Sequence, residues 1–135
     1  MPARLRLAPP ADVTAALARL RVAEPDLPDS TDLRMLTKHF LAVLESRAPG
    51  KSVEVRVPPY AAVQVIPGVR HTRGTPPAVV EMDAATWIAL AAGDADWFEV
   101  ERSGRVAASG ERTDLSAYLP LTDPDPHHTR PTDSP

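Results

Sequence analysis

Two arginines and a histidine gather in a short segment near the middle of the chain, GVRHTRGTPP at residues 68–77. Arg70, His71 and Arg73 are residue types that bind phosphate, carboxylate or a lipid head group, because the guanidinium group presents a planar fork of N–H donors. A short charged motif of this kind has low specificity and is equally typical of a solvated loop. Two roles therefore stay open for it, an anion site or a surface that docks a protein partner.

Catalysis by this segment is disfavoured. A histidine base needs a nucleophile that it orients, and the threonines beside His71 are neighbours in sequence only. The chain contains no nucleophile elbow, no glycine-rich phosphate loop and no His-Glu-x-x-His zinc motif. His127 and His128 are adjacent in a proline-rich tail, which does not make a closed metal site. We predict a protein that is not an enzyme, with no catalytic residues, no cofactor and no metal.

The composition of the chain limits the classes of protein to which it could belong. The 135 residues carry a formal net charge of −3, so the basic stripe of a nucleic-acid-binding protein is missing and no nucleic-acid partner is expected. The first residues lack an apolar core of signal-peptide length. No apolar stretch approaches the roughly 20 residues of a membrane span. The absence of cysteine suits a reducing compartment, and we expect a cytoplasmic protein with no integral membrane segment.

The elements that would position the basic segment can be read from periodicity. Apolar residues at helical spacing predict a helix after Pro10, with Asp12 as its N-cap, and a second helix beginning at Ser30. Alternating valines then predict strands at 53–57, 60–66 and 78–82, joined by short turns as an antiparallel meander, the second being the most central. Asp83 and Gly93 bound a third helix, followed by a short helix to Gly104, a strand at 105–109 and a final helical turn.

This order predicts one α+β domain with helices packed on one face of a mainly antiparallel sheet. Residues 1–29 form an N-terminal helix and a proline-rich linker that belong to the domain, and residues 30–121 form its main part. Residues 122–135 contain four prolines and no apolar periodicity, so we expect a disordered tail.

Three stretches carry a family resemblance: RHTRGTPP at 70–77, DAATWIALAAG at 83–93 and SGRVAASGERTDLSAYLPL at 103–121. Through them the chain from residue 33 to 121 resembles the actinobacterial sterol carrier family proteins, bacterial relatives of the sterol carrier protein type-two domain. The resemblance implies a sheet of about five strands, with an apolar cavity between the sheet and the helices that holds fatty acyl chains, acyl-CoA or sterols. The chain lacks the long Phe- and Met-rich segments of a roomy tunnel, which favours an acyl ligand.

The resemblance also implies where such a ligand would lie. The predicted cavity walls come from strands and helices on the two sides of the core: Leu36, Phe40, Val55, Val63, Val65, Trp87 and Leu90. Arg70, His71 and Arg73 would meet its polar head. Trp87 and Trp97 are expected to pack in the core, and a carrier would place one of them at the cavity mouth with Leu90, Phe98 and Tyr118. The alternative is a protein-interaction module of the same fold that docks a partner through the loop at 68–77.

Overall fold

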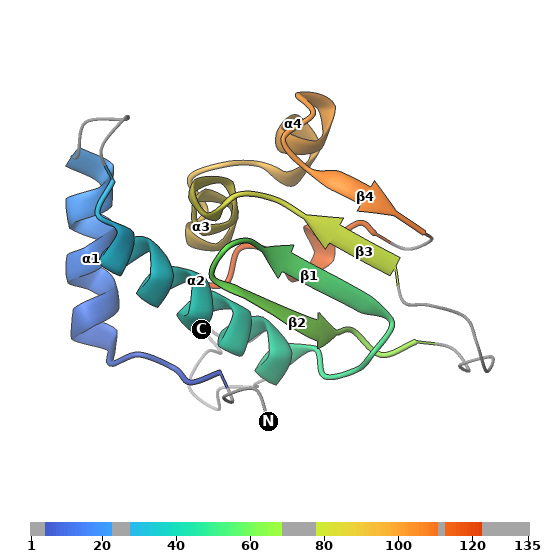
Figure 1. The fold of residues 1–135 in the computed structure, drawn as a ribbon, viewed down its shortest axis with the longest axis horizontal. Helices are drawn as coiled ribbons and strands as arrows, with labels where there is room; N and C mark the ends of the chain where they lie inside the picture. Colours follow the sequence, from blue (N-terminus) through green and yellow to red (C-terminus); the bar gives the residue numbers. More distant parts are fainter. Residues whose placement is uncertain (1–4, 23–27, 69–77, 111–112, 123–135) are drawn as a thin grey trace, which may run out of the picture.

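The computed structural model describes residues 5–22, 28–68, 78–110 and 113–122 (Figure 1). Of the predicted tail at 122–135, only Thr122 is among them. The elements follow in the order α1 (Pro10–Val22), α2 (Ser30–Arg47), β1 (Val53–Val57), β2 (Ala61–Val65), β3 (Ala78–Glu81), α3 (Ala84–Ala92), α4 (Trp97–Arg102), β4 (Ala107–Ser109) and the 3₁₀ helix η1 (Ser116–Tyr118). No helix in the described part of the chain is both long enough and apolar enough to span a membrane.

The α+β class is confirmed, and the described strands form a four-stranded mixed sheet in the order β2-β1-β3-β4. β1 pairs antiparallel with β2 and parallel with β3, and β3 pairs antiparallel with β4. The predicted meander is therefore wrong for its third strand, which lies beside β1 instead of β2. β2 is an edge strand and β1 an interior one, the reverse of the sequence-based expectation. Alternation indicates which face of a strand is buried, but it carries no information about the strand's neighbours.

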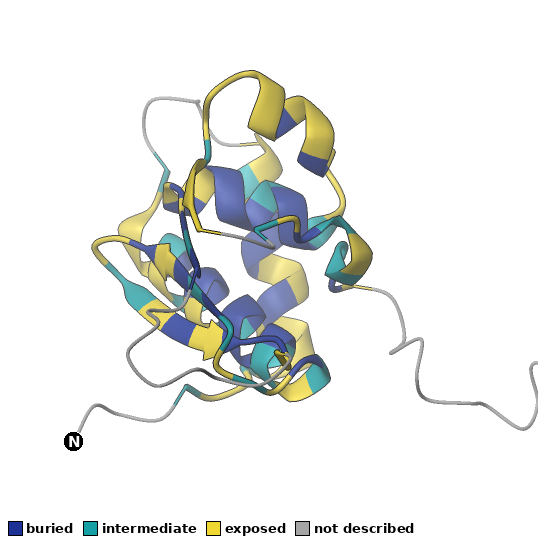
Figure 2. Cartoon of the chain, turned by 90° about the vertical axis from the view of Figure 1, so that its right-hand side faces the viewer, coloured by how far each residue is buried: buried dark blue, intermediate teal, exposed yellow. Residues whose placement is uncertain are grey.

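The register places the apolar side chains of neighbouring strands on one face. Val55 lies opposite Val63 on β2 and Val80 on β3, and all three are buried. Glu54 and Arg56, which pair with each other, alternate with these valines and occupy the other face. α2 and α3 pack against the valine face of the sheet, and α1 lies beside α2, away from the sheet (Figure 1). In Figure 2 the sheet lies to one side of the buried helices.

Local signals at the helix ends explain where most helices begin. The carboxylates of Asp29 and Asp83 accept N–H groups of the first turns of α2 and α3, so both predicted helix starts are confirmed. Gly93 ends α3 with φ at 84°, as its predicted capping role requires. Asp12 is not the N-cap of α1 as predicted; it lies within the first turn, because Pro10 already occupies a helical position that needs no N–H.

Candidate functional site

The structure brings the seven predicted cavity residues together in one buried core cluster. They come from α2, β1, β2 and α3, and none is more than 7% exposed: Leu36, Phe40, Val55, Val63, Val65, Trp87 and Leu90. Trp87 is completely buried, and its indole N–H donates to the backbone oxygen of Thr37 on α2 at 3.3 Å. These residues pack at the interface between the sheet and the helices. Their contact with a ligand stays a prediction.

The structure does not test the role of the basic segment. Arg70, His71 and Arg73 lie outside the described residues, so their role as an anion site or docking loop stays a prediction. Gly68, at the start of that segment, is described and exposed. A Cβ added there would lie 2.9 Å from the Cβ of Ser52. The lack of a side chain at Gly68 therefore allows its backbone to lie close to Ser52.

A groove opens where the end of α3, the start of α4 and the segment around η1 meet. Its volume is about 340 Å³. Ten residues from these segments line it: Leu90, Gly93, Asp94, Ala95, Asp96, Trp97, Glu99, Ser116, Leu119 and Pro120. Of the seven predicted cavity residues, only Leu90 is among them. The sequence does not predict this groove, although two of its lining residues, Leu90 and Trp97, are among those named above for a cavity mouth.

The backbone at this corner is fixed by the end of α3. Gly93 turns the chain out of the helix, and the next two backbone N–H groups, of Asp94 and Ala95, donate to the oxygen of Ala89 at 2.8 and 3.1 Å. The C-terminal segment is tied to the same helix, because the N–H of Leu121 donates to the oxygen of Ala91 at 2.7 Å. Two walls of the groove are thus hydrogen-bonded to the last turn of α3, which holds them at a fixed separation.

Carboxylates dominate the charge of the groove. Among the described residues, the charged side chains that line it are Asp94, Asp96 and Glu99, with no arginine, lysine or histidine. Asp94 is paired with Arg21 of α1 through contacts of 2.9 and 3.2 Å. One oxygen of Asp96 accepts the backbone N–H of Glu99 at 3.2 Å and thereby caps α4. The groove therefore has a negative rim that is only partly compensated.

Trp97 lines the groove and also packs into the core. The residue is 3% exposed and belongs to the core cluster, as predicted, yet its buried Nε1–H has no hydrogen-bond partner among the residues that the structure describes. A buried N–H without an acceptor is uncommon in proteins, since most buried polar groups are satisfied. Phe98 is 49% exposed, and neither it nor Tyr118 is among the residues that line the groove. The cavity mouth with Leu90, Phe98, Tyr118 and a tryptophan stays a prediction.

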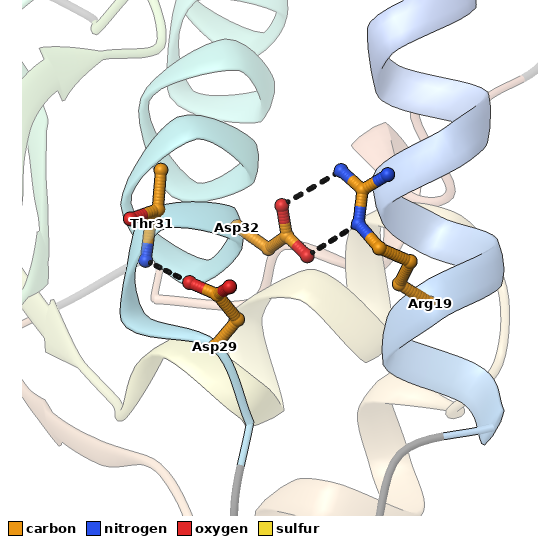
Figure 3. A network of polar contacts seen from close by, with 4 residues as sticks. All are labelled: Arg19, Asp29, Thr31 and Asp32. Atoms are coloured by element: carbon orange, nitrogen blue, oxygen red, sulfur yellow. Dashed lines mark hydrogen bonds and ion pairs between the residues drawn. The ribbon is translucent and has the colours of Figure 1, made fainter.

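Two arginines of helix α1 form ion pairs with other parts of the protein. Arg19 makes a bidentate contact with Asp32 at the start of α2, with both N···O distances at 2.9 Å (Figure 3). The hydrogen bond from Arg19 lowers the pKa of Asp32, against the opposing effect of burial. Arg21 reaches Asp94 at the groove, so α1 touches both the core helix and the groove rim. Val13, Ala16 and Leu17 of α1 add apolar contacts to the core cluster.

Comparison with known protein families assigns this fold. The family described as bacterial SCP ortholog, the bacterial counterparts of sterol carrier protein, matches residues 29–121. The match covers more than half of the chain, and the protein belongs to this family. It begins at Asp29, the N-cap of α2, so α1 lies before it, while the groove lies entirely within it. A search of curated proteins found no match.

Proposed function

We propose that the protein is a non-catalytic carrier of one apolar ligand of the fatty-acyl type. The observation that supports this most is the open groove, which lies within the family domain and is walled by two residues of the hydrophobic core, Leu90 and Trp97. An acyl chain seated there would cover Leu119 and Pro120 on the opposite side. Leu90 also belongs to the predicted cavity between sheet and helices, so the groove would serve as the entrance to that cavity.

The size of the groove favours a single chain. Small-molecule sites in proteins typically measure about 300–1,000 Å³, and a groove of about 340 Å³ is at the lower end of this range. Each methylene group removed from water contributes about 0.8 kcal/mol, so a modest length of chain is enough for useful affinity. A bulky polycyclic ligand fits such a space less well. The lack of cysteine is consistent with a carrier that acts in the cytoplasm.

The proposal is tested with monoacylglycerols of increasing chain length, which offer an acyl chain without a charge. The affinity should rise about fourfold per added methylene until the groove is filled, because 0.8 kcal/mol corresponds to that factor. Ala95 is half-buried and lines the groove, so Ala95→Trp should block it. Ala85 on α3 is exposed and outside the groove, and Ala85→Trp is the matched control. Equal affinity in the two variants, or no dependence on chain length, would contradict a carrier that binds through this groove.

The competing proposal is a protein-interaction module of the same fold that docks a partner through residues 68–77. It is motivated by the charges of Arg70, His71 and Arg73 in the sequence. It predicts that replacing both arginines by alanine abolishes capture of a partner while acyl ligands bind neither form. Saturable binding of a monoacylglycerol by the double variant would favour the carrier over this alternative.

A further inference from the structure

We propose that a hydrogen bond between Ala8 and His39 is a pH-sensitive latch, which holds the N-terminal segment at residues 5–9 on α2 and opens when the imidazole is protonated. The backbone N–H of Ala8 donates to Nδ1 of His39 at 2.9 Å. Leu5 and Ala8 are half-buried and pack against the core cluster, so opening the latch would uncover apolar side chains. The segment and α1 precede the residues matched by the family, and the latch does not depend on the proposed carrier function.

The hydrogen bond requires the neutral form of the imidazole. Nδ1 accepts an N–H only through its lone pair, so we assign the single ring proton of His39 to Nε2. Protonation adds an N–H at Nδ1, because both ring nitrogens are donors in the charged form. Two donors would then face each other at hydrogen-bond distance. The contact with Ala8 therefore breaks when the ring becomes charged.

Burial favours the neutral form of His39. The ring is half-buried on α2 and packs edge-on against that of Phe40, with the two centroids 5.0 Å apart. Burial lowers the pKa of His39 from the ordinary value of 6.5, because a charged imidazole is less well solvated there. Among the described residues, no neighbouring charge contributes to this shift.

The elements around His39 supply no buried counter-charge that would keep a protonated ring in place. β2 and α3, which contact α2, contain no charged residue. The charged side chains on residues 5–9, on α1 and within four positions of His39 on α2 are all exposed: Arg6, Asp12, Arg19, Arg21 and Lys38.

The latch and the ion pair of α1 respond to different pH ranges. Because the folded pKa of His39 lies below 6.5, the latch is closed at neutral pH and opens as the pH falls through that lower value. Arg19 still holds Asp32 in this range, because the pKa of that carboxyl is lowered from 3.8. Mildly acidic solution should therefore release residues 5–9 and leave α1 in place.

The test follows the backbone of ¹⁵N-labelled protein by NMR relaxation between about pH 7.5 and about pH 4.5. The order parameter of the Ala8 amide should fall from about 0.85, typical of rigid backbone, to below about 0.6. The midpoint of this change should coincide with the titration of the His39 ring, while the amide of Leu17 in α1 stays rigid. An Ala8 amide that stays rigid while His39 titrates, or a His39 ring that does not titrate in this range, would overturn the proposal.

Two substitutions of His39 distinguish the latch from a general effect of acid. In His39→Asn a side-chain oxygen can replace Nδ1 as acceptor and does not titrate, so residues 5–9 should stay rigid throughout the range. His39→Leu removes the acceptor, so the segment should be mobile already at neutral pH, with no further change in acid. His71→Asn removes a histidine elsewhere in the chain and should behave as the wild-type protein. A pH dependence that survives in both His39 variants would contradict the latch.

Discussion

Trp87 and Trp97 lie ten positions apart in the chain, and both are buried, yet they are in opposite situations. Trp87 on α3 packs at the centre of the core and has an acceptor for its N–H on the neighbouring helix α2. Trp97 at the start of α4 belongs to the same core cluster and lines an open groove, and its buried N–H has no acceptor in the described part of the chain. The first environment is complete within the protein, whereas the second borders the groove in which we propose that a ligand binds. The proposed carrier would thus separate stability at its centre from binding at one corner.

The largest expected effect is the loss of the central tryptophan. Trp87→Ala should lower the free energy of unfolding by about 3–5 kcal/mol, because a large buried side chain is removed from a core that closes incompletely. Ser116→Ala at the groove should change it by less than about 0.5 kcal/mol, as surface substitutions generally do. Urea denaturation followed by circular dichroism measures both. Similar losses for the two variants would remove the distinction between a structural centre and a binding corner.

A subtler substitution compares the two N–H groups directly. Replacing a tryptophan by phenylalanine removes the donor in both places, but only Trp87 loses a hydrogen bond. At Trp97 the change eliminates an unsatisfied polar group, whose burial costs about 1–3 kcal/mol. Trp87→Phe should therefore be more destabilising than Trp97→Phe, by about 1–2 kcal/mol in thermal or urea unfolding. A larger loss for Trp97→Phe would mean that its N–H is satisfied in the free protein.

Alanine substitutions at two glycines with positive φ distinguish the effect of backbone strain from the effect of groove shape. Gly93 and Gly104 have φ values of 84° and 80°, so an alanine at either position should cost about 1–2 kcal/mol of stability. A Cβ at Gly93 would lie 3.5 Å from the Cβ of Pro120 inside the groove, whereas one at Gly104 would have no neighbour within 4 Å. We therefore expect similar destabilisation by Gly93→Ala and Gly104→Ala, with a change in ligand affinity only for the first. Isothermal titration with monolaurin gives the second measurement, and equal affinities would place the ligand elsewhere.

The smallest expected effect concerns the ion pair between α1 and α2. Because Arg19 lowers the pKa of Asp32 in the folded protein, this pair stabilises the fold fully above the ordinary carboxyl pKa of 3.8. Its contribution is lost as the pH falls through the lower pKa of the folded state. Arg19→Gln should therefore reduce stability at neutral pH and flatten the acid limb of the stability profile. Urea denaturation midpoints of the wild-type protein and Arg19→Gln, measured across this pH range, test the prediction. If the pair contributes nothing, stability will depend on pH with the same slope in both proteins.

The sequence predicted the elements better than it predicted their neighbours. Alternating valines and the caps at Asp83 and Gly93 are local signals, and the structure confirms them. The parallel pairing of β3 with β1 depends on how the chain between β2 and β3 returns to the sheet, which no local periodicity encodes. For the same reason the edge position of β2 was not foreseen.

The groove escaped prediction because three separate segments build it. Leu90, Trp97 and Pro120 have no common spacing, and they meet only because the segment after η1 hydrogen-bonds to the end of α3. One local signal was available: the two aspartates at 94 and 96, which lie directly after a glycine cap and immediately before a tryptophan. The predicted basic loop, by contrast, rested on its charges and on its place in the family motif at 70–77, and its role stays a prediction.

The most direct test of the carrier account is native mass spectrometry of freshly purified protein, with lipid extraction from the same sample and Ala95→Trp prepared in parallel. We expect a stoichiometric adduct of the mass of an acyl lipid on the wild-type chain and its absence from the variant. If the wild-type protein shows only its own mass, and that mass is unchanged after incubation with monoacylglycerols such as monolaurin, the carrier account is contradicted and the interaction-module alternative takes its place.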